Sequence, residues 1–145
     1  MSKEMRELMN KFKTSMLEEN RKHRSEELEN KLLSFGGDNV KLGLDTNEEL
    51  DRMVNDGVLF DVEIVKTKGS FGQCHRNVAD KYNRFSSSGY KIATGYALGD
   101  GTWFQHSWGI GTTGTIMETT GNIYDMYYGY VLDEDESDEF CFNND

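Results

Sequence analysis

Residues 90–110, YKIATGYALGDGTWFQHSWGI, decide the fold of this chain. Two runs with partly alternating side chains, Tyr90–Leu98 and Thr102–Ile110, flank the turn sequence Gly99-Asp100-Gly101. A period of two is typical of strands, and a short glycine-rich link is typical of a hairpin. The stretch therefore predicts two antiparallel strands.

Further elements follow on both sides of this hairpin. The link Gly111–Gly114 leads to a third predicted strand, Thr115–Thr119, and Tyr124–Leu132 is a fourth, rich in tyrosine. Before the hairpin, Cys74–Phe85 has apolar residues at helical spacing, and Ser86–Gly89 ends that helix. A helix packed on an antiparallel β-sheet is expected, so the fold class is α+β.

The N-terminal segment is predicted to be helical over residues 2–33. Its apolar side chains recur at spacings of three and four, which gives one stripe along a helix: Met5, Leu8, Met9, Phe12 and Met16. Residues 18–27 are charged on every face, so one long helix and two shorter ones both remain open. We interpret the segment as a packing or oligomer helix, with a helix that binds a partner protein as the alternative.

A second helix and a strand are predicted before the core. Thr46 and Glu49 have the spacing of a capping box, which begins a helix at Asn47–Asn55. Val58–Val65 then partly alternates, as a strand does. The predicted organisation is a helical segment over residues 1–57, an α+β core over 58–132 and an acidic tail over 133–145.

Charge is concentrated in that tail. The chain has a net charge of −10 over 145 residues, and Asp133–Glu139 holds six acidic residues, with Asp145 as a seventh. The rest of the chain is nearly balanced and has no basic patch, so nucleic acid is not an expected partner. We expect the tail to be solvated and disordered, with a docking tail for a basic partner as the alternative.

The two cysteines and the charged N-terminus indicate the compartment. One pair, Cys74 and Cys141, is no disulfide framework, and Met1–Phe12 has neither an apolar signal region nor a membrane span. The expected location is the cytoplasm, or the host cytoplasm if the chain is phage-encoded, with no membrane partner.

Cys74 is the candidate nucleophile. A thiol reacts as the thiolate, and a helix N-terminus and a nearby imidazolium lower its pKa. Cys74 begins a predicted helix, so backbone amides point toward the sulfur. These amides and the Gln73 region are candidates for stabilising an oxyanion.

His106 is the candidate base, because it lies in mid-strand between aromatic residues that would exclude water. Glu118, on the adjacent predicted strand, is the candidate that orients the imidazole, with Asn122 in reserve. Each residue also has a plainer interpretation. Cys74 is then a small buried side chain, His106 a core histidine and Glu118 a surface residue in a salt bridge.

Several short motifs occur in a fixed order: Gln73-Cys74, a helix with Asn77 and Ala79, Gly95-Tyr96-Ala97, His106-Ser107-Trp108 and Glu118-Thr119. In this order residues 72–131 resemble the core of transglutaminase-like and related papain-like cysteine enzymes. The family pattern has a cysteine at a helix start, a GYA-like strand, a histidine followed at two by tryptophan, and an acidic residue followed by threonine. The N-terminal third is outside this resemblance.

The resemblance implies a papain-like or transglutaminase-like core with Cys74 as nucleophile, His106 as general base and Glu118 as orienting acid. Gln73, Asn77 and Trp108 are the implied oxyanion or substrate-binding residues. The chain departs from the family at 118, where Asp is usual and Glu is one methylene longer. The implied activity is acyl transfer on an amide by a peptidase, deamidase or transamidase that needs no cofactor and acts on a protein or peptide.

Other sites are less well supported. We expect His75 to face solvent, and a zinc site at Cys74, His75 and His106 lacks the usual ligand spacing. Gly69-Ser70-Phe71-Gly72 lacks the Lys-Ser/Thr ending of a phosphate loop.

The alternative function is a non-catalytic interaction protein, such as a phage-type accessory protein that binds a host protein through its N-terminal helix or acidic tail.

Overall fold

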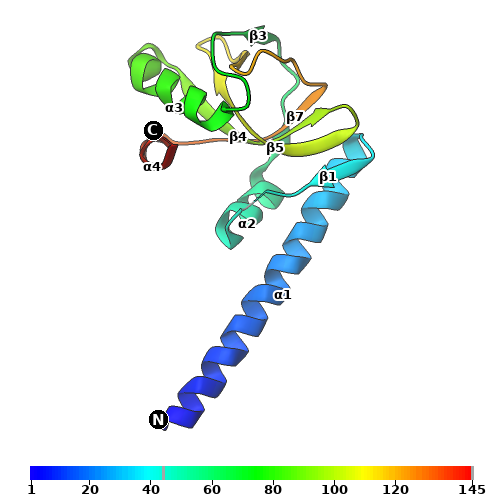
Figure 1. Ribbon diagram of the computed structural model, residues 1–145, viewed down its shortest axis with the longest axis vertical. Coiled ribbons are helices and arrows are strands. Elements are labelled where there is room, and N and C mark those ends of the chain that lie inside the picture. The colour runs from blue at the N-terminus through cyan, green and yellow to red at the C-terminus, as the bar shows by residue number, and fades with distance from the viewer. Residues whose placement is uncertain (44, 145) are drawn as a thin grey trace.

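The structure is a computed structural model that describes residues 1–43 and 45–144, and it has the predicted α+β class (Figure 1). The helices are α1 (Lys3–Phe35), α2 (Asn47–Asp56), α3 (Cys74–Phe85), the short 3-10 helix η1 (Ser86–Ser88) and α4 (Glu134–Asn144). The strands are β1 (Asn39–Lys41), β2 (Val58–Leu59), β3 (Ile64–Lys66), β4 (Lys91–Gly99), β5 (Thr102–Ile110), β6 (Ile116–Glu118) and β7 (Met126–Val131).

The sheet is mixed, and the prediction of a purely antiparallel sheet is wrong. The β4–β5 hairpin and the antiparallel β5–β6 pair form as predicted. However, β7 pairs with β4 on the far side of the hairpin, and β1 and β3 add in parallel to β5 and β6. The strand order is β2-β7-β4-β5-β6-β3, with β1 beside β5.

The sheet is also strongly curled. The predicted strand Val58–Val65 is instead two strands at opposite ends of the sheet, β2 paired with β7 and β3 paired with β6. Only Phe60–Glu63 joins them, and four residues span at most about 14 Å. The two ends of a six-strand path must therefore approach each other, which curls the sheet around an inner face.

Alternation along the strands creates two separate cores. The inner core lies within the curl, and Phe60 of the segment between β2 and β3 packs against it. Its buried members are Ala93, Ala97, Trp108, Ile110, Ile116 and Tyr127. The outer core lies between the sheet and the helices, and its members include Leu28, Leu32, Leu50, Met53, Val78, Ala79, Tyr96, Trp103 and Tyr128. The C-terminal half of α1 therefore belongs to the same folded unit as the sheet.

Two facing glycines make the curl possible. Gly95 in β4 pairs with Gly129 in β7. A Cβ on Gly95 would lie 2.0 Å from the Tyr128 carbonyl oxygen, and one on Gly129 would lie 2.1 Å from the Thr94 carbonyl oxygen. Any larger residue would push β4 and β7 apart at the centre of the sheet.

The N-terminal segment is a single long helix. The Ser2 hydroxyl accepts a hydrogen bond from the Met5 amide at 3.1 Å and caps α1, which continues through the charged stretch without a break. Figure 1 shows the N-terminal half of α1 projecting away from the sheet and the other helices. Within the described chain, no helix combines the length and apolar character needed to cross a membrane.

The acidic tail forms helix α4, so the prediction of a disordered tail is wrong. Asp133 and Glu136 cap the helix reciprocally, because each carboxylate accepts the other residue's amide, at 2.8 and 2.9 Å. Ser137 and Cys141 are buried, and the Cys141 Sγ donates to the Ala79 carbonyl oxygen of α3. The acidic side chains lie mostly on the exposed side of α4, and Asp145 is outside the described residues.

Replacement of Gly95 should test the close approach of β4 and β7. We expect Gly95→Ala to lower the free energy of unfolding by about 2 kcal/mol or more, because the added methyl overlaps backbone that cannot move away. Gly111→Ala is the matched control, since its Cβ would meet side chains rather than backbone, with Met117 Sδ at 3.1 Å and Thr115 Oγ1 at 3.2 Å. Urea unfolding measures both, and equal small losses would contradict this packing.

Candidate functional site

Cys74 is the first residue of α3 and is held next to the end of β6 by the loop before it. Asn77 fixes this loop, because its side-chain amide bonds the amide and carbonyl of Ser70 and the carbonyl oxygen of Thr119. The Thr67 amide and hydroxyl both donate to the Glu118 carbonyl oxygen, at 2.7 and 3.3 Å. Cys74 is therefore tied to the strand that carries Glu118.

His106 lies in the middle of β5 and is only 2% exposed. Its ring points to the inner face, among aromatic rings whose centroids are 5.0–6.1 Å away: Phe104, Trp108, Tyr124 and Tyr127. Trp108 stacks on the imidazole at an interplanar angle of 23°, whereas the other three rings are edge-on or tilted. These rings exclude water and fix the imidazole plane.

A gap in the strand pairing lets the thiol reach this histidine. On the side of β5 away from β4, β1 covers Thr102–Phe104 and β6 covers Gly109 and Ile110. His106 and Ser107 lie between these two covered parts, and α3 packs against β5. The start of α3 lies at the part of the β5 edge that neither β1 nor β6 covers. Cys74 and His106 therefore interact there, although most of α3 packs on the outer face of the sheet.

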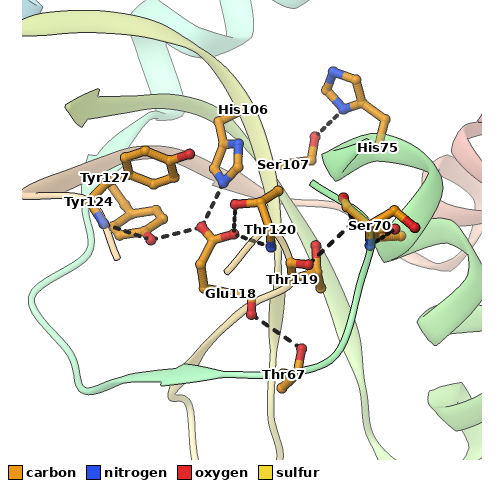
Figure 2. A network of polar contacts seen from close by, with 11 residues as sticks. Thr67, Ser70, His75, His106, Ser107, Glu118, Thr119, Thr120, Tyr124 and Tyr127 are labelled. Carbon is orange, nitrogen blue, oxygen red and sulfur yellow. Dashed lines mark hydrogen bonds and ion pairs between the residues drawn. The ribbon is translucent and has the colours of Figure 1, made fainter. Parts of the chain in front are cut away.

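Glu118 holds the far side of the His106 ring. His106 Nε2 lies 2.7 Å from Glu118 Oε1, and neither side chain is more than 2% exposed. Because an ionised carboxylate only accepts hydrogen bonds, Nε2 carries the proton, which leaves Nδ1 to face the thiol. Figure 2 shows the imidazole aimed at the carboxylate from above.

The Glu118 carboxylate is saturated by donors. Tyr127 donates its hydroxyl to Oε1 at 2.8 Å, and Thr120 donates its hydroxyl and amide to Oε2 at 2.7 and 2.9 Å. With His106, each oxygen accepts two hydrogen bonds (Figure 2). This set of donors stabilises the charged form of a carboxylate that is 0% exposed.

The electrostatics favour a thiolate and an imidazolium. Burial alone would raise the pKa of the Cys74 thiol, but hydrogen bonds from His106 and His75 outweigh burial and lower the pKa to about 5. Burial alone would lower the pKa of His106, but hydrogen bonds with Cys74 and Glu118 raise it to about 9. Burial alone would raise the pKa of Glu118, and the hydrogen bond from His106 lowers it below its usual value.

His75 is a second imidazole at the thiol, so the prediction that it faces solvent is wrong. Its Nδ1 is 2.7 Å from the Ser107 hydroxyl, which is 3.0 Å from the Thr94 hydroxyl. Phe140 of α4 packs on the ring edge, with centroids 5.8 Å apart. A helix residue next to Cys74 turns inward because β5 offers a buried hydroxyl and α4 covers the ring.

The structure separates the other predicted site residues. Gln73 is exposed and lies directly before Cys74, at the N-cap of α3. Asn77 uses its amide to hold the loop, so its predicted oxyanion role is wrong. Trp108 is 0% exposed and backs the His106 ring, so it is no substrate contact. The reserve residue Asn122 is exposed, and Glu118 has the orienting position.

The sequence interpretation missed the hydroxyls at the site. Thr120 follows Glu118 by two residues, which is the spacing at which a threonine bonds a preceding carboxylate. Tyr127 was predicted only to lie in a tyrosine-rich strand, because its hydrogen bond to Glu118 on β6 depends on the curl of the sheet. A cavity of about 490 Å³ borders the site between the sheet and helices α2, α3 and α4, with His75, Thr94, Gln105, Arg52, Glu136 and Phe140 in its wall.

A metal centre is not indicated. Across residues 1–43 and 45–144, no three side chains of His, Cys, Asp or Glu gather as a metal site would need. Comparison with known proteins gives no assignment either, because no protein-family model, no curated protein and no solved structure matches this chain. The case for a function rests on the geometry of the site.

Two buried tyrosines allow a matched test of the carboxylate network. Tyr127→Phe removes a donor to a buried charge, so we expect a loss of about 1.5–3 kcal/mol in the free energy of unfolding. Tyr90→Phe is the control, because among the described residues the buried Tyr90 hydroxyl has no hydrogen-bond partner. Its removal should change stability little. Urea unfolding of both variants decides, and equal effects would mean that the Tyr127 hydroxyl does not support Glu118.

Proposed function

We propose that this chain is a cysteine-dependent enzyme that transfers the acyl group of an amide to water or to an amine. One observation carries the proposal: His106 donates a hydrogen bond from Nε2–H to the saturated carboxylate of Glu118, and the same imidazole interacts with Cys74 at a helix start. The order Cys74, His106, Glu118 and the resemblance of residues 72–131 to transglutaminase-like and papain-like enzymes support the same conclusion.

The first half of the reaction forms a thioester. The Cys74 thiolate attacks the amide carbon, a C–S bond forms, and the carbonyl π electrons move to oxygen. The proposed donors to that oxyanion are backbone amides at the start of α3 and the Gln73 side chain. The imidazolium of His106 gives its Nδ1 proton to the departing nitrogen, the C–N bond breaks, and an amine leaves.

The second half regenerates the thiolate. Water or an acceptor amine gives a proton to the now neutral His106 Nδ1 and attacks the thioester carbon. The tetrahedral intermediate then expels the sulfur as thiolate, and His106 is an imidazolium again. Water gives a carboxylic acid and an acceptor amine gives a new amide, so peptidase, deamidase and transamidase chemistry share these steps.

Glu118 and His75 have supporting roles in this proposal. Glu118 stays ionised and keeps the proton on Nε2, which holds the ring in the productive tautomer. Its extra methylene relative to aspartate is compatible with this role, because the 2.7 Å contact is already made. His75, held by the Ser107 hydroxyl, stabilises the thiolate from the other side and does not take part in proton transfer.

The proposed substrate is a protein or peptide amide, with no cofactor, and the proposed location is the cytoplasm. A thiolate at neutral pH is readily oxidised, and a reducing compartment protects it. The interaction-protein alternative is favoured by one specific observation, which is that residues 1–20 of α1 are all exposed.

Thiol alkylation tests the activated nucleophile. Iodoacetamide should label Cys74 at least tenfold faster than Cys141 at neutral pH, because Cys74 is ionised and Cys141 is only 6% exposed. The rate at Cys74 should rise as pH increases through about 5 and then level off. In His106→Ala, the loss of the imidazole should move this rise toward an ordinary thiol pKa, and mass spectrometry of the labelled peptides gives both rates.

Product analysis tests the reaction itself. The full chain is incubated with a peptide library in ¹⁸O-labelled water, with and without a biotinylated primary amine. New ¹⁸O-labelled peptide ends indicate hydrolysis, ¹⁸O on glutamate indicates deamidation, and biotin on glutamine indicates transamidation. The rate should form a bell between pH values of about 5 and 9, since Cys74 must be ionised and His106 protonated.

Cys74→Ala is the control and should abolish every product. Slow, equal labelling of both cysteines, together with no product in any channel, would refute the enzyme and leave the interaction protein.

A further inference from the structure

The N-terminal half of α1 carries an apolar face that nothing in the described chain covers. Every residue from 1 to 20 is exposed. The large apolar side chains on one face are about half to two-thirds exposed: Met5 at 51%, Leu8 at 64%, Met9 at 48%, Phe12 at 67% and Met16 at 56%. A projecting helix of this length is marginal in water by itself, so packing must stabilise it.

This face points away from the rest of the protein. The domain holds α1 through a different stripe, in which Leu28 and Leu32 are buried, Arg24 pairs with Asp51, and Lys31 donates to the Val54 carbonyl oxygen. At 100° per residue, the apolar face lies roughly a third of a turn around the helix from that stripe. A second helix can therefore lie along residues 1–19 without meeting α2.

The spacing fits a second copy of the same helix. Met5, Met9, Phe12 and Met16 are separated by four, three and four residues, which is the period of 3.5 that keeps a seam facing a partner helix. The seam is two heptads long. With Leu8 at its edge, the seam offers five large side chains to an interface, and a stable interface buries roughly 800 Å² on each partner.

We propose that α1 pairs in parallel with α1 of a second copy through this seam, so that the chain is a dimer. Parallel pairing places Leu8 of each helix beside Lys13 of the other, where the long basic side chain lies over the apolar one and keeps its charge in water. Antiparallel pairing of the same layers would instead place Arg6 beside Lys13 twice along one edge of the seam, and those like charges repel. The charges at the seam edge therefore select the orientation.

The dimer is tested by measuring the mass of the full chain in solution. Sedimentation equilibrium should give twice the chain mass of 16.6 kDa. Phe12→Glu should weaken association at least a hundredfold, because it places two carboxylates opposite each other in the seam. Leu17→Glu is the matched control: Leu17 is similarly exposed, at 57%, but lies on another face of α1, so its variant should remain a dimer.

Oxidative cross-linking tests the orientation, with Cys74→Ala as background to remove the reactive thiol. Phe12→Cys should give a disulfide-linked dimer, because position 12 meets itself in a parallel pair, whereas Leu17→Cys should not. If the chain is a monomer at about 0.1 mM, the proposal is overturned, because the dissociation constant of the dimer would then exceed the micromolar range. Dimerisation of Phe12→Glu, or equal cross-linking at 12 and 17, would also overturn it. Because Phe12 is far from the thiol, Cys74 labelling should be unchanged in Phe12→Glu.

Discussion

The buried pair of His106 and Glu118 is the constraint on which the rest of the structure depends. Taking two charged groups out of water costs several kcal/mol for each, and their attraction offsets this only when the remaining hydrogen bonds are satisfied. The curled sheet provides those bonds, since Thr120 follows β6 directly and Tyr127 comes from β7 across the inner face. The glycine pair in β4 and β7 and the crossing segment from β2 to β3 maintain the curl that brings them together.

The same curl explains how an outer helix serves an inner histidine. A fully paired β5 would separate α3 from the His106 ring, but β1 and β6 are both short and leave the middle of that edge open. The loop before α3 is fastened to β6 by Asn77 and Thr67, so Cys74 and Glu118 are positioned by one strand. Thiol, imidazole and carboxylate therefore share a single framework.

Local patterns predicted the parts of this arrangement that depend on neighbouring residues. The hairpin, the capping box at Thr46 and Glu49, and the helix that begins at Cys74 are each confirmed, because their signals lie within a few residues. Pairing of β7 with β4 was not predictable, since it depends on how two glycines meet across the sheet. Asp133 and Glu136 did carry a capping signal, but the acidic composition of the tail obscured it. His75 turns inward because β5 offers the Ser107 hydroxyl and α4 covers the ring, and neither was predictable from its neighbours in the sequence.

A structural role alone would explain the charged pair poorly. Apolar side chains of similar size usually fill a buried site at equal or lower free energy, so stability gives no reason to keep an imidazole and a carboxylate there. The imidazole of this pair also interacts with the half-buried Cys74 thiol, whose pKa is lowered. A buried cysteine with a purely structural role has a thiol pKa at or above the ordinary value, because burial disfavours the thiolate. A carboxylate that fixes one ring nitrogen and a thiolate that meets the other is the arrangement that acyl transfer requires. The charge distribution thus supports the proposed enzyme more strongly than the alternative, a non-catalytic interaction protein.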